Sequence, residues 1–310
     1  MQSKIVILGT GGTIAGTAVS PADAVGYTAA QLGVAQLLAA VPSLAQAPIE
    51  CEQVAQLDSK DMDFATWQRL AQRVAQHLAR AEVAGVVVTH GTDTLEETAY
   101  FLHRVLAPSK PLVLTAAMRP ATSLQADGPQ NLLDAVTLAR DGQVGGVSVV
   151  MAGCAWAAAD VRKRHTYRLD AFGGGDAGPL AVIEEGRVRA LCVAHRAGPG
   201  LGLDVIARDC AAWPRVETVL NYAGATGGLV DALVAQGVGG LVAAGTGNGT
   251  LSAALESALR RAARAGVRVL RASRCADGPV LGGDAGELPS AGAMSAVQAR
   301  VELLLQLLAR

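Results

Sequence analysis

Apolar residues follow two alternating patterns along the chain. Short, nearly continuous apolar runs are typical of parallel strands buried on both faces. They occur at residues 4–8, 84–89, 111–116, 145–151, 239–244 and 267–271. Between them apolar residues recur at helical spacing, most clearly at residues 64–80, 94–106, 129–140, 251–265 and 294–309. This alternation predicts an α/β protein with mostly parallel sheets and right-handed crossovers.

The alternation is interrupted once. Residues 192–215 contain Gly-Pro-Gly and lack a clear period, which is typical of a linker. We therefore predict a larger N-terminal flavodoxin- or Rossmann-like domain over residues 1–191, the linker, and a smaller C-terminal α/β domain over residues 216–310. A chain of 310 residues is long enough to bury a core in each domain.

Composition narrows the class of protein. The net charge of −1 provides no broad field for binding nucleic acid or an anionic membrane. The uncharged stretch at 232–255 is interrupted by Gln236, Asn248 and several glycines, which favours a strand, a loop and a helix start over a membrane span. Five widely spaced cysteines without a CxxC motif argue against a disulfide framework or a zinc site. The first strand begins by residue 4, so we expect no signal peptide and a cytoplasmic protein.

A glycine-rich loop follows the first predicted strand. Residues 9–16 read GTGGTIAG and include Thr13. Ligands of open α/β sheets bind beyond the carboxyl ends of strands, so this position favours a site. A dinucleotide fingerprint would need glycine where Ile14 stands, and a phosphate-binding P-loop would need lysine after Gly16. A nucleotide site is therefore weakly supported, and a tight turn without chemistry stays open.

A second stretch has the same plan. Residues 86–102, VVVTHGTDTLEETAYFL, give a buried strand, a glycine turn, and then Thr92 and Asp93. Two strand ends that carry hydroxyls beside glycine predict convergence on one small ligand. Asp93 could cap the following helix or bind a substrate ammonium group. Thr94 and Glu97 have the spacing of a capping box, which predicts the start of that helix.

Lysine is rare in this chain. Of 26 basic residues only four are lysine, and Lys163 stands between two arginines. A desolvated ammonium group can release a proton, whereas a guanidinium group stays charged at any accessible pH. A proton-transfer role at Lys163 and a chance placement are equally compatible with this pattern.

Six motifs together resemble the bacterial-type L-asparaginase family, and they span most of the chain. The motifs are TGGTIAG at 10–16, DSKDM at 58–62, HGTDTLEETAYFL at 90–102, AAMRP at 116–120, DGPQNLLDAV at 127–136 and GTGNGTL at 245–251. The resemblance implies hydrolysis of the side-chain amide of asparagine through a threonine nucleophile and an acyl-enzyme. It implies no metal or organic cofactor.

The resemblance also implies roles for the nucleophile and its activating groups. Thr13 matches the nucleophile, and Tyr27 matches the tyrosine of a mobile flap. Thr92, Asp93 and Lys163 match the second reactive group. A threonine hydroxyl is a poor nucleophile until a base accepts its proton. The sequence leaves open whether that base is Tyr27 or the Thr92–Lys163 pair.

Further positions match the family's substrate-binding residues. Ala117 and the Thr92 backbone match groups that stabilise the oxyanion, an interaction that contributes much of the catalysis of acyl transfer. Ser59 matches a residue that holds the substrate α-carboxylate, and Asp93 matches the one that holds its α-ammonium group. Asn248 matches a residue lent across a dimer interface. The resemblance therefore implies an intimate dimer, with a dimer of such dimers, a homotetramer, usual in the family.

The chain departs from the family pattern in three places. Lys60 stands where many relatives have an uncharged or acidic residue; a cation there should repel an α-ammonium group but could bind the α-carboxylate. The segment at 275–292 looks shorter than in secreted members, and Glu287 is the candidate for the acidic residue that a neighbouring subunit contributes. The cysteines of the disulfide found in some secreted relatives have no counterpart here.

Several alternatives stay open. A glutaminase-asparaginase differs in substrate by one methylene, worth only ~1–3 kcal/mol of discrimination. The amidase subunit of a tRNA-dependent amidotransferase resembles asparaginases but usually has an extra N-terminal domain. A non-catalytic amino-acid-binding protein of the same fold would be favoured by loss of the reactive residues, which are all present. A nucleotide-binding module is the most distant alternative.

Overall fold

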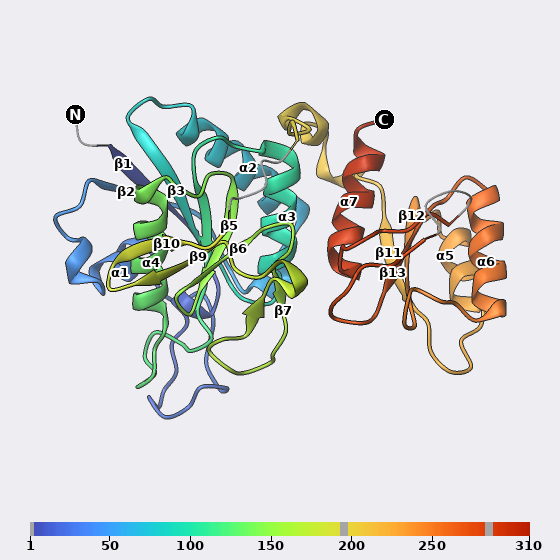
Figure 1. Cartoon of the computed structure of the whole chain (residues 1–310), viewed down its shortest axis with the longest axis horizontal. Helices are drawn as coiled ribbons and strands as arrows, with labels where there is room; N and C mark the ends of the chain where they lie inside the picture. The colour runs from blue at the N-terminus through green and yellow to red at the C-terminus, as the bar shows by residue number, and fades with distance from the viewer. Residues whose placement is uncertain (1–2, 193–197, 283–287) are drawn as a thin grey trace. The chain divides into compact units, whose positions relative to one another are not determined.

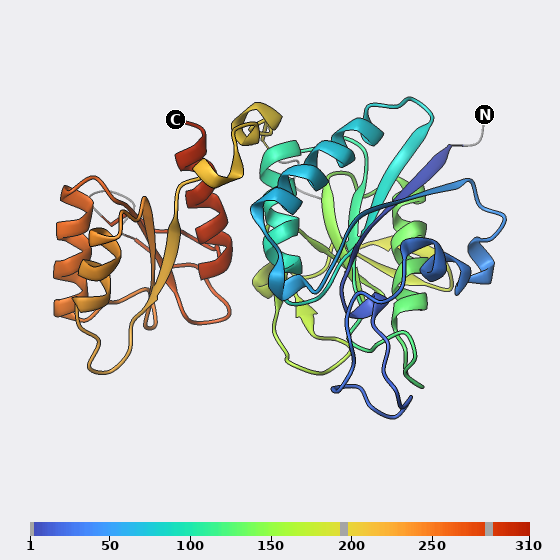
Figure 2. The same cartoon turned by 180° about the vertical axis from the view of Figure 1, so that it is seen from behind.

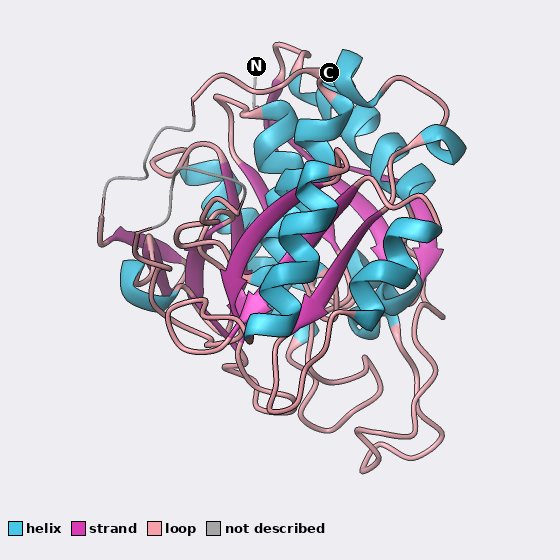
Figure 3. Cartoon of the chain, turned by 90° about the vertical axis from the view of Figure 1, so that its right-hand side faces the viewer, coloured by secondary structure: helices cyan, strands magenta, loops and turns pink. Residues whose placement is uncertain are grey.

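The computed structural model describes residues 3–192, 198–282 and 288–310. The chain divides into two compact units, Met1–Leu203 and Asp204–Arg310. Each unit is built from strands and helices packed in layers (Figures 1 and 3).

The first unit is organised around an eight-stranded sheet. Its strand order is β10-β9-β6-β5-β4-β3-β1-β2. Five strands are parallel: β1 (Lys4–Gly11), β2 (Ile49–Leu57), β3 (Val83–Thr89), β4 (Leu112–Thr115) and β5 (Val147–Met151). Three strands extend the sheet in antiparallel fashion: β6 (Cys154–Ala157), β9 (Ala181–Glu184) and β10 (Arg187–Ala190). A separate ribbon pairs β7 (Arg162–Lys163) with β8 (Phe172–Gly173).

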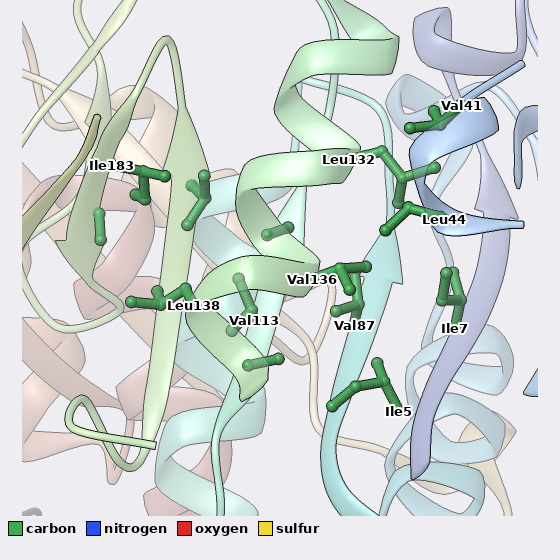
Figure 4. Close-up of a cluster of buried hydrophobic side chains, with 14 of the residues drawn as sticks. Ile5, Ile7, Val41, Leu44, Val87, Val113, Leu132, Val136, Leu138 and Ile183 are labelled. Carbon is green, nitrogen blue, oxygen red and sulfur yellow. The ribbon is translucent and has the colours of Figure 1, made fainter. Parts of the chain in front are cut away.

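Helices cover both faces of this sheet. Helices α2 (Phe64–Leu78) and α3 (Leu95–Leu106) pack together on one face, and α1 (Val34–Ala39) and α4 (Gly128–Asp141) pack on the other (Figure 1). The central strands are apolar along their whole length because both of their faces are buried. Figure 4 shows side chains of α4, among them Leu132 and Val136, packed against side chains of β1, β3 and β4.

The second unit repeats the plan on a smaller scale. Its parallel sheet consists of β11 (Val216–Leu220), β12 (Gly240–Gly245) and β13 (Arg268–Ser273). Helices α5 (Gly228–Ala235) and α6 (Ala253–Arg264) pack together, and α7 (Ala296–Leu308) packs against all three strands. Its core is formed by side chains such as Leu241, Leu255 and Leu259.

The fold confirms the α/β prediction, with mostly parallel sheets in both units. All six predicted strands and all five predicted helices are present, with bounds that differ by a few residues. The predicted capping box at Thr94 is wrong. Its hydroxyl makes no capping bond to the helix and instead donates to the carbonyl of Ser59, at 2.8 Å. The hydroxyl therefore ties the turn after β3 to the turn after β2.

Two further structural facts concern the cysteines and the possibility of a membrane-spanning helix. All five cysteines are free thiols. Among the residues that the structure describes, no helix has the length and apolar character needed to cross a membrane.

Candidate active site

Thr13 stands at the carboxyl end of β1, in a turn that only glycine permits. Gly11 and Gly12 have φ angles of 104° and 82°, a region that residues with side chains rarely adopt. A Cβ atom on Gly12 would lie 2.3 Å from the Cα of Gly91, so the turns after β1 and β3 are in backbone contact. Thr13 then opens a short 3-10 helix and is 7% exposed. The glycines thus bring two strand ends together beside a buried hydroxyl.

Tyr27 contacts the Thr13 hydroxyl directly. The Thr13 Oγ1 and Tyr27 Oη atoms are 2.7 Å apart, and either oxygen can be the donor. The segment that carries Tyr27 is anchored by two backbone hydrogen bonds between Thr17 and Thr28, each 2.9 Å long. A Cβ atom on Gly16 would lie 2.9 Å from the Tyr27 ring, so glycine at that position makes room for the ring. In Figure 2 the dark-blue chain after β1 leaves the body of the unit as a long loop before it returns.

Thr92, Asp93 and Lys163 form a second cluster, at the carboxyl end of β3. Lys163 Nζ donates to Thr92 Oγ1 at 2.8 Å and to Asp93 Oδ1 at 2.7 Å. Thr92 is 5% exposed, and the side chains of Lys163 and Asp93 are 19% and 52% exposed. Lys163 reaches the cluster from β7, where it pairs with Phe172 of β8. The ammonium group therefore has a fixed direction between a buried hydroxyl and a partly exposed carboxylate.

Ser59 joins the turn after β2 to this cluster. Its buried Oγ accepts the backbone N–H of Asp93 at 3.1 Å. Lys60, the next residue, points elsewhere. Its side chain is 65% exposed and its Nζ lies 2.8 Å from Asp58 Oδ2, a contact that raises the pKa of the ammonium group. In this structure Lys60 pairs with its own loop.

The remaining predicted residues lie in three different places. Ala117 is fully buried in the loop that follows β4. Asn248 belongs to the second unit, where its amide donates to the carbonyl of Leu281 at 3.0 Å and accepts the N–H of Leu281 at 2.7 Å. Glu287 lies outside the described residues.

Two titratable groups adjoin the second cluster, one partly buried and one fully buried. Glu96, in the first turn of α3, accepts the backbone N–H of Lys163, and burial raises its pKa from 4.5 to about 7. His90 is fully buried, and burial lowers its pKa from 6.5 to about 4. The His90 imidazole is therefore neutral at pH 7. Its Nδ1 lies 2.7 Å from the carbonyl oxygen of Gly91 and its Nε2 lies 3.0 Å from Thr98 Oγ1, which holds the turn in place.

Glu96 and His90 lie in the motif at 90–102, but the sequence alone points to no role in the site for either residue. The same holds for Asp127 and Asn131, which contact the Ala117 loop. The place of Asp127 before Gly-Pro at a helix start predicts a capping carboxylate, but its side chain makes no capping bond to α4 and accepts N–H groups of the Ala117 loop instead. Among the described residues no group of three or more His, Cys, Asp or Glu side chains is arranged to hold a metal ion.

Family models match both parts of the chain. The N-terminal asparaginase domain matches residues 4–193, and the glutaminase/asparaginase C-terminal domain matches residues 215–310. The chain belongs to the asparaginase family.

Individual relatives agree with this assignment. The chain is 38% identical to the glutaminase-asparaginase of Pseudomonas fluorescens, over 87% of this chain and 75% of that protein. It is 39% identical to L-asparaginase 2 of Escherichia coli, over 89% of this chain and 79% of that protein. The crystal structure of a probable cytoplasmic L-asparaginase from Campylobacter jejuni matches with a TM-score of 0.92 at 37% identity, covering 98% of this chain and 95% of that one. A relative in Haemophilus influenzae is named a probable periplasmic L-asparaginase.

Proposed function

We propose that the protein is an L-asparagine amidohydrolase that releases ammonia and aspartate through an acyl-enzyme on Thr13. One observation supports this proposal most directly. The buried Thr13 hydroxyl contacts Tyr27, and the turn that carries Thr13 packs against the turn that carries the Thr92–Lys163–Asp93 cluster. A nucleophile and an acid–base group at adjacent strand ends are the components that acyl transfer requires.

The first half-reaction forms the acyl-enzyme. Thr13 Oγ1 attacks the side-chain amide carbon, and its proton passes to the Tyr27 oxygen, 2.7 Å away, as the Tyr27 hydroxyl releases its own proton toward the amide nitrogen. The new bond joins Oγ1 to the carbonyl carbon. The C–N bond then breaks, and the nitrogen, which has taken up the proton released by Tyr27, departs as ammonia. Because the hydroxyl itself is a weak nucleophile, this proton transfer is needed before attack.

The second half-reaction releases aspartate. A water molecule attacks the ester carbon and gives a proton, through the Thr92 hydroxyl, to a Lys163 amine that has first released one proton to solvent. The ester C–O bond then breaks, and Thr13 Oγ1 takes up the proton that came from water, which restores its hydroxyl. The Lys163 ammonium group stabilises negative charge that develops at this end of the site, and Asp93 balances its charge through the 2.7 Å contact. Positioned charges and donors of this kind stabilise acyl-transfer transition states because they need no reorganisation during the reaction.

Substrate recognition uses the groups around the two clusters. We assign the α-carboxylate of the substrate to Ser59 and to Lys60, whose ammonium group would have to leave Asp58 to bind it. We assign the α-ammonium group to the half-exposed Asp93 carboxylate. Ala117 and the Thr92 backbone are assigned to the oxyanion.

We also propose a homo-oligomer located in the cytoplasm. Asn248 and Glu287 would serve the site of a neighbouring subunit in an intimate dimer, and two such dimers would form a tetramer. Support comes from the resemblance of the motif around Asn248 and from the cytoplasmic name of the Campylobacter jejuni structure.

The second candidate function is a glutaminase-asparaginase of mixed specificity, and it is favoured by the name of the Pseudomonas fluorescens relative. The test compares ammonia release from asparagine and from glutamine by the purified protein over a range of concentrations. A much larger kcat/KM for asparagine supports the first function. Comparable values would establish the second, and release from neither amide would reject both.

A further inference from the structure

Two side chains at the start of α4 contact the loop that contains Ala117. Asp127 is the residue immediately before the helix, and Asn131 lies one turn later. Asp127 is partly buried and Asn131 is 2% exposed. Neither residue has a part in the reaction as proposed above.

Asp127 holds the chain on one side of Ala117. Its Oδ2 accepts the backbone N–H of Met118 at 2.9 Å, and its Oδ1 accepts the N–H of Arg119 at 2.9 Å. A carboxylate is suited to this position because it offers an acceptor oxygen to each of two N–H groups. An asparagine side chain would offer one oxygen and would point its own N–H₂ group at the second donor.

Asn131 holds the chain on the other side of Ala117. Its Nδ2 donates to the carbonyl of Ala116 at 3.0 Å and to Asp127 Oδ2 at 3.1 Å. Its Oδ1 accepts the N–H of Ala152 at 3.0 Å, which fixes the orientation of the amide. The two side chains therefore bond to each other and to both peptide groups that flank Ala117.

Peptide planarity turns these contacts into a constraint on Ala117 itself. In a trans peptide group the C=O and the N–H of the next residue point in opposite directions. Because the carbonyl of Ala116 points to Asn131, the N–H of Ala117 points away from α4. Because the N–H of Met118 points to Asp127, the carbonyl of Ala117 also points away from α4. Both polar groups of Ala117 are thus aimed by side chains that they do not touch.

The same loop lies against the nucleophile turn. A Cβ atom on Gly128, the first residue of α4, would lie 2.9 Å from Ile14, the residue after the nucleophile, and 3.6 Å from the Ala117 Cβ. The N–H of Ala121 donates to the carbonyl of Gly16 at 2.9 Å. A shift of the Ala117 loop would therefore change its position relative to Thr13.

We propose that Asp127 and Asn131 act as a peptide clamp, a pair of positioning residues that orient the backbone of Ala117 toward the substrate amide during acyl transfer. The proposal rests on the proposed function, since it assigns the clamp to that reaction. The clamp touches no substrate atom, and its effect is exerted through the two peptide groups. A misplacement of about 1 Å at a reacting centre can lower the rate by ~10²-fold.

The test uses Asp127→Asn and a matched control, Asp134→Asn. Asp134 lies on the same helix, is 3% exposed, has a pKa raised by burial as Asp127 has, and bonds to Gln130 rather than to the Ala117 loop. We expect kcat for asparagine to fall by ~10²-fold in Asp127→Asn, while KM and the affinity for aspartate change little. Asp134→Asn should keep a kcat close to that of the wild type.

Asn131→Asp provides a second variant of unchanged shape that lacks the donor to Ala116, and it should also lose kcat. Hydrogen exchange supplies a readout independent of activity: the amides of Met118 and Arg119 should exchange faster in Asp127→Asn and at the wild-type rate in Asp134→Asn. Thermal unfolding of each variant gives the folded fraction used to correct kcat.

Two outcomes would overturn the clamp. One is a folded Asp127→Asn variant with wild-type kcat or wild-type exchange at Met118 and Arg119. The other is a loss of kcat that is equally large in Asp134→Asn, or that the unfolded fraction explains in both Asp127→Asn and Asn131→Asp. Either result would make the role of the two residues structural. Absence of ammonia release by the wild-type protein would instead reject the proposed function, and the exchange rates would still decide whether the clamp exists.

Discussion

Replacing Glu96 by glutamine should make the protein more stable at neutral and alkaline pH. The Glu96 carboxylate is partly buried in the first turn of α3, and desolvation raises its pKa from 4.5 to about 7 despite the N–H of Lys163 that it accepts. A glutamine side chain has nearly the same shape, still offers an oxygen to that N–H, and carries no charge. The variant therefore removes the cost of ionising a partly buried group.

The size and sign of the effect follow from the two pKa values. A rise from 4.5 to about 7 corresponds to about 3 kcal/mol against the ionised folded form, at 1.36 kcal/mol for each pH unit. Below pH 4.5 the group is protonated in both states and costs nothing. Between pH 4.5 and about 7 the folded state binds more protons than the unfolded state, so the stability of the wild type falls as pH rises. Above pH 7 the whole cost is present. Glu96→Gln should recover ~1–3 kcal/mol of it, because the amide is itself a partly buried polar group.

Urea unfolding of the wild type and Glu96→Gln at a series of pH values from 4.5 to 8 measures the difference in their free energies of unfolding. The midpoints can be compared where the two proteins have equal m-values. The stability gain of Glu96→Gln should be near zero at the acid end and should grow toward pH 8. Glu184→Gln is the control, because Glu184 is exposed and Arg189 lowers its pKa. Its effect should therefore stay constant over this range. A gain in Glu96→Gln that does not change with pH, or a loss of stability at pH 8, would refute the reasoning.

Three further predictions concern catalysis and binding. Lys163→Arg should lower turnover by ~10²–10⁴-fold with little effect on binding, because arginine keeps its proton. If Lys163→Arg has a turnover within a few-fold of wild type while Lys163→Met is inactive, Lys163 supplies charge and not a proton. Proteolysis within residues 17–30 should slow when asparagine or aspartate is added, since Tyr27 contacts the nucleophile and we expect its segment to close over the ligand. Unchanged cleavage at saturating ligand would count against this closure. Lys60→Gln should weaken binding of asparagine more than binding of an analogue with an amidated α-carboxylate, and equal losses would mean that Lys60 does not contact the carboxylate.

The central strands could be predicted from the sequence because their burial leaves a local signature. Strand β3, for example, is apolar along its length, since α2 and α4 cover its two faces. The edge strand β2 was missed for the opposite reason. Its sequence, IECEQVAQL, is only partly buried, and nothing in it shows that it pairs with β1. The short antiparallel strands beyond β5 were missed as well, because pairing with distant segments, rather than composition, determines them.

The reactive residues could be proposed because they stand in recognisable motifs, but their supports could not. Lys163 was ambiguous from composition alone, and the structure places its ammonium group between Thr92 and Asp93. Asp127 acts on backbone groups eight and nine residues away, and Asn131 on a carbonyl fifteen residues away. The direction of a peptide group in a loop is a three-dimensional property, and a single sequence carries no pattern that reports it.

The central claim is that this chain hydrolyses asparagine through Thr13. The most direct measurement is the release of ammonia and aspartate from asparagine by the purified wild-type protein and by Thr13→Ala, with both proteins shown to be folded by thermal unfolding. We expect equal amounts of the two products from the wild type and a rate lower by several orders of magnitude in Thr13→Ala, because the nucleophile acts as part of the whole catalytic unit. Near-normal turnover by a folded Thr13→Ala variant would contradict the account.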